Sequence, residues 1–179
     1  MGKRSEQLSS SQIEFIQTQH MFFVATAAPE GRINLSPKGM DTLRVINPTE
    51  ITWLNLTGSG NETAAHIEST PRMTMMWCAF EGRPLILRAY GEAKLIDASH
   101  PRWSTFMETF PSLPGARQII TLKIDLVQSS CGMGVPFYDY QGERDGLIKW
   151  ANQKGEVGVK EYRDQKNRLS LDGKSIHSY

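Results

Sequence analysis

Residues 84–96 read Pro-Leu-Ile-Leu-Arg-Ala-Tyr-Gly-Glu-Ala-Lys-Leu-Ile, and this stretch decides the fold class. Small and apolar residues recur at every second position from Leu85 to Leu95, opposite Arg88, Glu92 and Lys94. A period of two places the apolar residues on one face of an extended strand and the charged residues on the other. The stretch therefore predicts a strand with one face toward a core and the other toward water.

Segments with a strand pattern precede and follow this stretch. They lie at residues 22–28, 33–36, 51–57, 72–80 and 120–126, with Pro37 and Gly39 expected to end the second of them. Several links, such as the turn Glu81-Gly82-Arg83, are too short for the crossovers that parallel strands need. The sequence therefore predicts a mainly β fold, an antiparallel barrel of about six strands with peripheral helices.

The peripheral helices have their own signals. Ser11 with Glu14 three residues later is typical of a capping box and predicts a short opening helix. Aromatic residues at helical spacing after Ser99 and Pro101 predict a helix that ends before Pro111. Further helices are expected at residues 62–69, 147–153 and 157–166.

Composition narrows the class of protein. The 179 residues carry 20 Lys+Arg against 19 Asp+Glu, so no overall field favours nucleic acid or an anionic membrane. The two cysteines are too few for a disulfide framework, and no histidine spacing indicates a metal site. No apolar run approaches the roughly 18 residues of a bilayer span. We therefore expect a cytoplasmic protein without a membrane or nucleic-acid partner.

The segment Thr57-Gly58-Ser59-Gly60-Asn61-Glu62-Thr63 is the first candidate site. Glycines between the end of a strand and the start of a helix leave backbone N–H groups exposed and converging, which favours phosphate. Asn61 or Ser59 is expected to cap the helix, and Thr63 offers a hydroxyl. A capped helix behind a glycine turn, with no ligand, explains the same residues.

The segment Asn34-Leu35-Ser36-Pro37-Lys38-Gly39 is the second candidate. It places a hydroxyl and an ammonium group around a rigid turn at the end of a strand. Lys38 can act as a counter-charge to phosphate, although a solvated turn lysine has the same pattern.

These two segments, with Ser130-Cys131-Gly132, Val135-Pro136-Phe137 and the ending Ser170-Leu171-Asp172-Gly173, resemble the flavin-binding split-barrel family related to pyridoxamine 5'-phosphate oxidase. The resemblance implies a six-stranded antiparallel Greek-key split barrel that forms a homodimer with FMN at the subunit interface. It also implies residues that bind FMN, namely Ser36, Lys38, Thr57, Gly58, Ser59, Asn61 and Thr63. We expect residues 1–132 to form the FMN-binding domain and residues 133–179 a helical appendage packed on it.

Two departures from the family bear on the substrate. Pyridoxamine phosphate oxidases carry Ser-Arg-Lys where this chain has Asn61-Glu62-Thr63, and their C-terminal Arg-Leu-His is replaced by Arg168-Leu169-Ser170. The resemblance therefore implies an FMN-dependent oxidoreductase acting on a small molecule other than pyridoxamine phosphate, with NADH or NADPH as a candidate donor. No side chain is an evident general acid or base, so the catalytic residues are unknown.

Three alternatives remain open at this point. A carrier or sensor that binds flavin without turnover has the same binding residues. Haem is another candidate, because some related split barrels bind it through a single histidine. Finally, Gly58-Ser59-Gly60 imitates a dinucleotide fingerprint with Glu81 about 20 residues later, although the third glycine position is Thr63.

Overall fold

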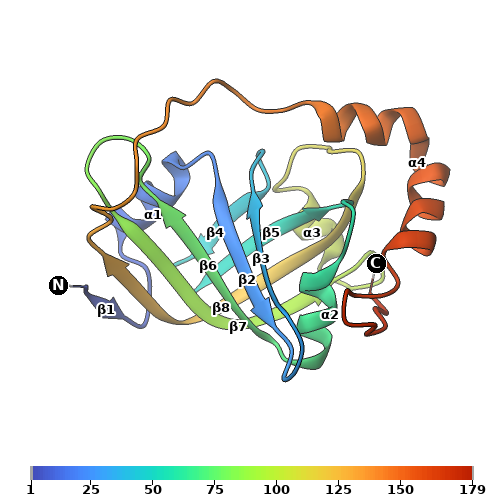
Figure 1. Ribbon diagram of the computed structural model, residues 1–179, viewed down its shortest axis with the longest axis horizontal. Coiled ribbons are helices and arrows are strands. Elements are labelled where there is room, and N and C mark those ends of the chain that lie inside the picture. The colour runs from blue at the N-terminus through green and yellow to red at the C-terminus, as the bar shows by residue number, and fades with distance from the viewer. Residues whose placement is uncertain (1, 179) are drawn as a thin grey trace.

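The alternating segments form one antiparallel sheet in the computed structural model, which describes residues 2–178 (Figure 1). The sheet order is β3-β2-β6-β7-β8-β5-β4, and β1 pairs with β8. The strands are β1 (Arg4–Ser5), β2 (Phe22–Ala27), β3 (Ile33–Lys38), β4 (Leu43–Asn47), β5 (Glu50–Leu56), β6 (Arg72–Cys78), β7 (Ile86–Ile96) and β8 (Ala116–Ser130).

The connections confirm the predicted fold class. Strands β6, β7 and β8 follow one another as antiparallel neighbours, and β5, which precedes them in the chain, lies beside β8. This is a Greek-key arrangement. No pairing between the described residues joins the end strands β3 and β4, so the barrel is split. Antiparallel pairing also excludes the parallel dinucleotide-binding sheet.

The sheet has eight strands instead of about six, because the sequence pattern missed β1 and β4. Strand β1 is only two exposed residues long. Strand β4 has five residues, none of them fully buried, and its pairing with β5 is irregular between Val45 and Asn47. Neither segment has a clear alternation of apolar and polar residues by which a strand could be recognised in the sequence.

Strand β3 was expected to end at Pro37, but it continues to Lys38, with Pro37 opposite Phe23 of β2. Proline cannot donate a ladder hydrogen bond, and it is therefore tolerated on edge strands. Strand β3 stands at one end of the sheet order, which explains the tolerance.

The helices are α1 (Ser10–Thr18), α2 (Glu62–Ser69), α3 (Trp103–Met107) and α4 (Gly146–Lys166). The capping box of α1 is formed by Ser9 and Gln12, two residues before the predicted pair. Ser99 does not cap α3, because its hydroxyl donates to Asp97. Helix α4 contains the two predicted C-terminal helices, separated by a kink at Gly155 (φ 65°). No helix within residues 2–178 is long and apolar enough to cross a membrane.

The core includes a large cluster inside the barrel, a smaller one beneath α3, and a third between α2 and the C-terminal segment. Strand β8 contributes to the first two, because Ile120 faces the large cluster and Ile119 the smaller one. The large cluster includes the fully buried Trp77 of β6 and Leu87 of β7, and the alternation in 84–96 predicts the burial of Leu87. The smaller cluster comprises Leu54, Ile96, Phe106, Phe110 and Ile119.

The register of β7 against β8 depends on Gly91. The pairing shifts by one residue between Tyr90 and Gly91, and a Cβ on Gly91 would overlap the carbonyl oxygen of Lys123. We expect Gly91→Ala to lower the free energy of unfolding by about 2 kcal/mol, because the strand must shift to accept the methyl group. Urea denaturation of the purified protein measures this change.

The control for this prediction is Gly58→Ala, at a position where an added Cβ meets nothing within 4 Å. Its unfolding free energy should match that of the wild type. Equal stability of Gly91→Ala and Gly58→Ala would contradict the role assigned to the β7–β8 irregularity.

Candidate functional site

The two candidate segments of the sequence meet at one cavity of about 230 Å³, here called the Arg117 cavity. It lies between the inner face of β3, the end of β5 and the loop that leads into α2. Six of the seven predicted binding residues line it, namely Ser36, Lys38, Gly58, Ser59, Asn61 and Thr63.

Thr57 is the exception, because it is buried behind the loop and does not line the cavity. Its hydroxyl donates to the carbonyl of Gly115 at 2.8 Å and accepts from Nε of Arg163 at 2.7 Å. The structure therefore places Thr57 where it fixes the loop, and not where it faces a ligand.

The alternation of β3 explains why its polar residues share this cavity. Asn34, Ser36 and Lys38 lie two residues apart and point to one face, whereas Ile33 and Leu35 are exposed on the other. Because β3 continues through Pro37, Lys38 stays in register with Ser36. A strand that ended at Ser36 would not fix Lys38 in this way.

Helix α2 begins at the cavity without a side-chain cap. Asn61 was expected to provide one, but its Oδ1 accepts from Nδ2 of the buried Asn55 at 3.3 Å instead. The amide Nδ2 of Asn61 is then left without a hydrogen-bond partner within the described residues.

Unpartnered donors gather around this cavity. Five buried side-chain polar atoms in residues 2–178 lack a partner, and three of them belong to its lining: Ser36 Oγ, Asn61 Nδ2 and Arg117 Nε. Buried polar groups are almost always hydrogen-bonded, so a concentration of unpartnered ones is typical of a ligand site. All three atoms can donate, so an acceptor such as an anion would satisfy them.

The charges at the cavity favour the same ligand. Within the described residues, neither Lys38 nor Arg117 has a carboxylate within 4.0 Å. Burial, with the nearby positive charge of Arg117, lowers the pKa of Lys38 to about 8. Burial, with the charge of Arg163, lowers the pKa of Arg117 to about 9. Both groups therefore carry a charge at pH 7, and they repel each other until an anion is present.

Arg117, Asn55 and Leu56 are the lining residues that lie outside both candidate segments of the sequence. Arg117 stands near the start of β8, more than 50 residues beyond the glycine loop. Only the pairing of β5 with β8 brings it to the loop, where it donates to the carbonyl of Gly60. The one local feature of the sequence that could have pointed to Arg117 is that a charged residue precedes the apolar run 119–120.

The acid at position 62 lines the cavity and has a hydrogen-bond partner of its own. Both carboxylate oxygens of Glu62 accept from the backbone N–H of Leu171, at 3.0 and 3.2 Å. The carboxylate is therefore used in holding the C-terminal segment against α2.

A larger cavity of about 870 Å³, here called the Tyr140 cavity, adjoins the first through Lys38, which lines both. The rings of His20 and Tyr140 stack in it with centroids 3.6 Å apart. The Tyr140 hydroxyl donates to Glu143, which also accepts from the N–H of Met40. Its lining comes from residues 18–21, 37–40, 80–82, 138–144, 146 and 147.

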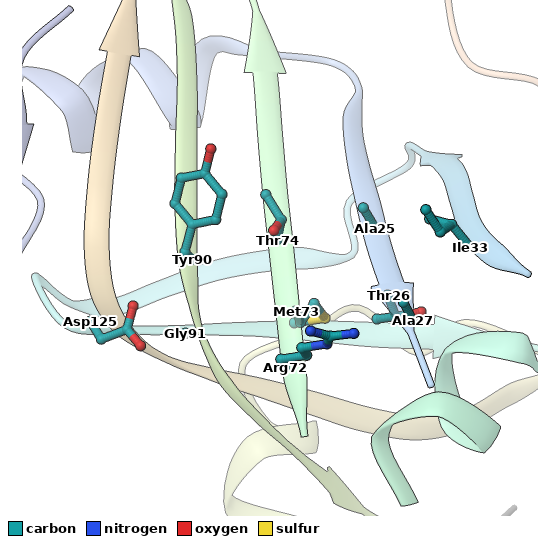
Figure 2. A pocket seen from close by; sticks show the side chains of 10 residues that line it. All are labelled: Ala25, Thr26, Ala27, Ile33, Arg72, Met73, Thr74, Tyr90, Gly91 and Asp125. Atoms are coloured by element: carbon teal, nitrogen blue, oxygen red, sulfur yellow. The ribbon is translucent and has the colours of Figure 1, made fainter. Parts of the chain in front are cut away.

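A third hollow of about 400 Å³ lies on the outer face of the sheet and is here called the sheet groove (Figure 2). Small side chains form much of its floor, including Ala25, Ala27 and Thr74, and Tyr90 stands on the neighbouring strand. The exposed side chain of Ile33 lies at its edge.

Comparison with known proteins identifies the family. Residues 11–131 match the family model described as pyridoxamine 5'-phosphate oxidase. The chain belongs to the pyridoxamine 5'-phosphate oxidase family. It is 36% identical over 194 residues to the pyridoxamine 5'-phosphate oxidase family protein ustO of Aspergillus flavus, covering 97% of this chain and 77% of that protein.

Solved structures share the fold at low identity. A Lactobacillus delbrueckii protein superposes with a TM-score of 0.56 at 17% identity, covering 69% of this chain and 94% of that one. HupZ from Group A Streptococcus gives 0.54 at 16% identity, covering 66% and 91%. These similarities support the split-barrel fold of this family member. The match to the family model ends before α4 and the C-terminal segment.

The depressed pKa of Lys38 makes a prediction for the flavin-free protein. Between about pH 8 and 10.5 the unfolded chain binds this proton more tightly than the folded one, so Lys38 makes stability rise with pH in that window. Lys38→Met should remove this contribution and stabilise the protein at pH 7, where a buried charge is lost. Thermal unfolding in phosphate-free buffers measures both effects.

The matched control is Lys94→Met, which changes an exposed lysine of β7. Its unfolding temperature should follow the wild-type pH dependence. If Lys38→Met ran parallel to the wild type from pH 8 to 10, the buried charge of Lys38 would be refuted.

Proposed function

We propose that this chain binds FMN, with the phosphate in the Arg117 cavity, and acts as an FMN-dependent oxidoreductase. The observation that carries the proposal is the set of three unpartnered buried donors beside two cations without carboxylate partners. Membership of the pyridoxamine 5'-phosphate oxidase family supports a flavin as the group that carries this phosphate.

The proposal assigns a role to each residue of the cavity. Lys38 and Arg117 provide the positive charge, while Ser36 and Asn61 donate hydrogen bonds to phosphate oxygens. The backbone of the loop at Gly58 and Ser59 and the hydroxyl of Thr63 complete the site, and Thr57 holds the loop from behind. Neither packing nor a positive φ requires glycine at position 58. A ligand that approaches the backbone closely at this position would explain the glycine.

When bound, the flavin ring would supply electron transfer at its N5, and the residues of the chain hold and shield it. We place the substrate in the Tyr140 cavity, because that cavity adjoins the phosphate site at Lys38. The substrate is a small molecule other than pyridoxamine phosphate, since Glu62 replaces a basic residue of such oxidases. A reduced nicotinamide is the proposed electron donor.

We also propose that two copies of the chain pair through the sheet groove. Ile33 and Leu35 are 77% and 63% exposed beside small side chains, so the surface is apolar and shallow. A twofold pairing would cover it and close the outer side of β3, whose inner side carries the phosphate residues. A cytoplasmic location completes the proposal, in keeping with two free cysteines.

The first experiment is a visible spectrum of the purified protein, with the cofactor released by heat and identified by chromatography. A flavin spectrum and released FMN are expected. Lys38→Ala should weaken FMN binding about tenfold, because one charge-assisted hydrogen bond to phosphate is lost. Titration of the flavin-free protein with FMN, followed by fluorescence, measures the affinity.

Other outcomes of this experiment point elsewhere. Unchanged FMN affinity in Lys38→Ala would overturn its assigned role. A Soret band would favour haem, and a colourless protein that FMN cannot reconstitute would leave only the family and the fold. Bound FMN that neither NADH nor NADPH reduces would favour the carrier or sensor over an enzyme using a nicotinamide donor.

The proposed dimer makes a separate prediction. Leu35→Glu should convert a dimer to a monomer, because it places a charge on the exposed apolar face of β3 beside Ile33. Light scattering coupled to gel filtration measures the mass. Val157→Glu, at a 73% exposed position of α4, is the control and should stay dimeric. A wild-type monomer, or a Leu35→Glu dimer, would contradict this interface.

A further inference from the structure

Arg117 is held from behind by the C-terminal part of the chain. Its Nη1 donates to Oδ1 of Asn167 at 2.7 Å, and both Nη atoms lie 3.3–3.4 Å from the carbonyl of Gly60. Asn167 is fully buried. These contacts use the Nη side of the guanidinium and leave Nε as the unpartnered donor of the Arg117 cavity.

The same asparagine also holds the glycine loop. Its Nδ2 donates to the carbonyl of Gly58 at 3.3 Å, and Arg163, one helical turn earlier, binds Thr57 and the carbonyls of Gly115 and Ala116. The end of α4 therefore contacts both the loop and the start of β8, the two segments that provide the phosphate residues.

The segment after α4, residues 167–178, is fixed along α2 (Figure 1). Glu62 accepts from the N–H of Leu171, and Glu68 accepts from the N–H groups of His177 and Ser178. Ile176 is buried against Ala64 and Ala65 of α2. Asn167 thus begins a segment that is anchored along its length, so its side chain has a defined place.

We propose that Asn167 is a positioning residue for the phosphate site, which fixes Arg117 so that its free N–H and its charge serve the ligand. This inference rests on the proposed FMN site. It extends the functional unit beyond residues 11–131, the part that matches the family model.

An amide suits this task better than a carboxylate. Its oxygen accepts the hydrogen bond that orients the guanidinium, but it adds no charge, so the positive charge of Arg117 remains for the anion. An aspartate at this position would pair with Arg117 and repel phosphate. A neutral acceptor at position 167 is therefore consistent with an Arg117 whose charge is available to a ligand.

The test compares Asn167→Asp with the wild type in the flavin-free full-length protein. FMN and riboflavin are titrated in parallel, because riboflavin has the same ring and ribityl chain but no phosphate. Asn167→Asp should weaken FMN binding at least about tenfold and change riboflavin binding less than twofold. Asn152→Asp makes the same charge change at an exposed position of α4 and should bind both ligands as the wild type does.

A second variant and a second ligand keep the test decisive if Asn167→Asp folds poorly. Asn167→Ala should also weaken FMN selectively, by a smaller factor, because Arg117 loses its orienting acceptor without gaining a negative charge. The rise in unfolding temperature on replacing chloride by inorganic phosphate, at equal ionic strength, should be smaller in both variants than in the wild type.

Each outcome decides the inference. Wild-type FMN affinity in both variants, or an equal loss of FMN and riboflavin, would overturn it and leave the proposed FMN site standing. If the wild type bound neither flavin, the proposed function would fail. The rise in unfolding temperature caused by inorganic phosphate would then be the only test of the positioning role. A rise reduced in the Asn167 variants would support the positioning role, and an unchanged or absent rise would overturn it.

Discussion

The burial of Arg117 without a carboxylate is the constraint on which the site depends. Removing a guanidinium from water costs several kcal/mol, and proteins usually offset this cost with an ion pair. Here the offset is limited to neutral acceptors, the carbonyl of Gly60 and the amide of Asn167. Such an arrangement retains a buried positive charge at the expense of stability. A bound anion that supplied the missing partner would explain it.

This constraint also explains the placement of the acidic residues nearby. Glu62 lies at the start of α2 and lines the cavity, where a free carboxylate would compete with phosphate. Its oxygens are occupied by the N–H of Leu171 instead. Position 62 supplies no positive charge, and a basic side chain, Arg117, reaches the cavity from β8. The charge needed for an anion is therefore provided from another strand, and the acid serves the C-terminal segment.

Local patterns in the sequence predicted what depends on local physics. Alternation located β7 and the middle of β8, and the glycine loop with Lys38 located most of the candidate site. The features that the sequence did not predict depend on residues that are distant in the chain or on neighbouring strands. Pro37 is tolerated within β3 because that strand is at an edge of the sheet. Asn61 is the N-cap residue of α2, but its side chain does not cap the helix because its Oδ1 accepts from Asn55. Arg117 reaches the loop through the pairing of β5 with β8, which no local spacing contains.

The cavity is therefore a product of the whole fold and not of its motifs. Strand β3 brings Ser36 and Lys38, the loop after β5 brings its backbone, and β8 brings Arg117. The end of α4 then fixes two of these three segments through Asn167. The two cations repel each other until an anion binds. In the empty protein these segments are held by strand pairing and by hydrogen bonds from Arg117 and Asn167 to neutral acceptors. A ligand that neutralised the cations would add to the cohesion of every segment at once, so anion binding in this cavity would raise the global stability of the protein.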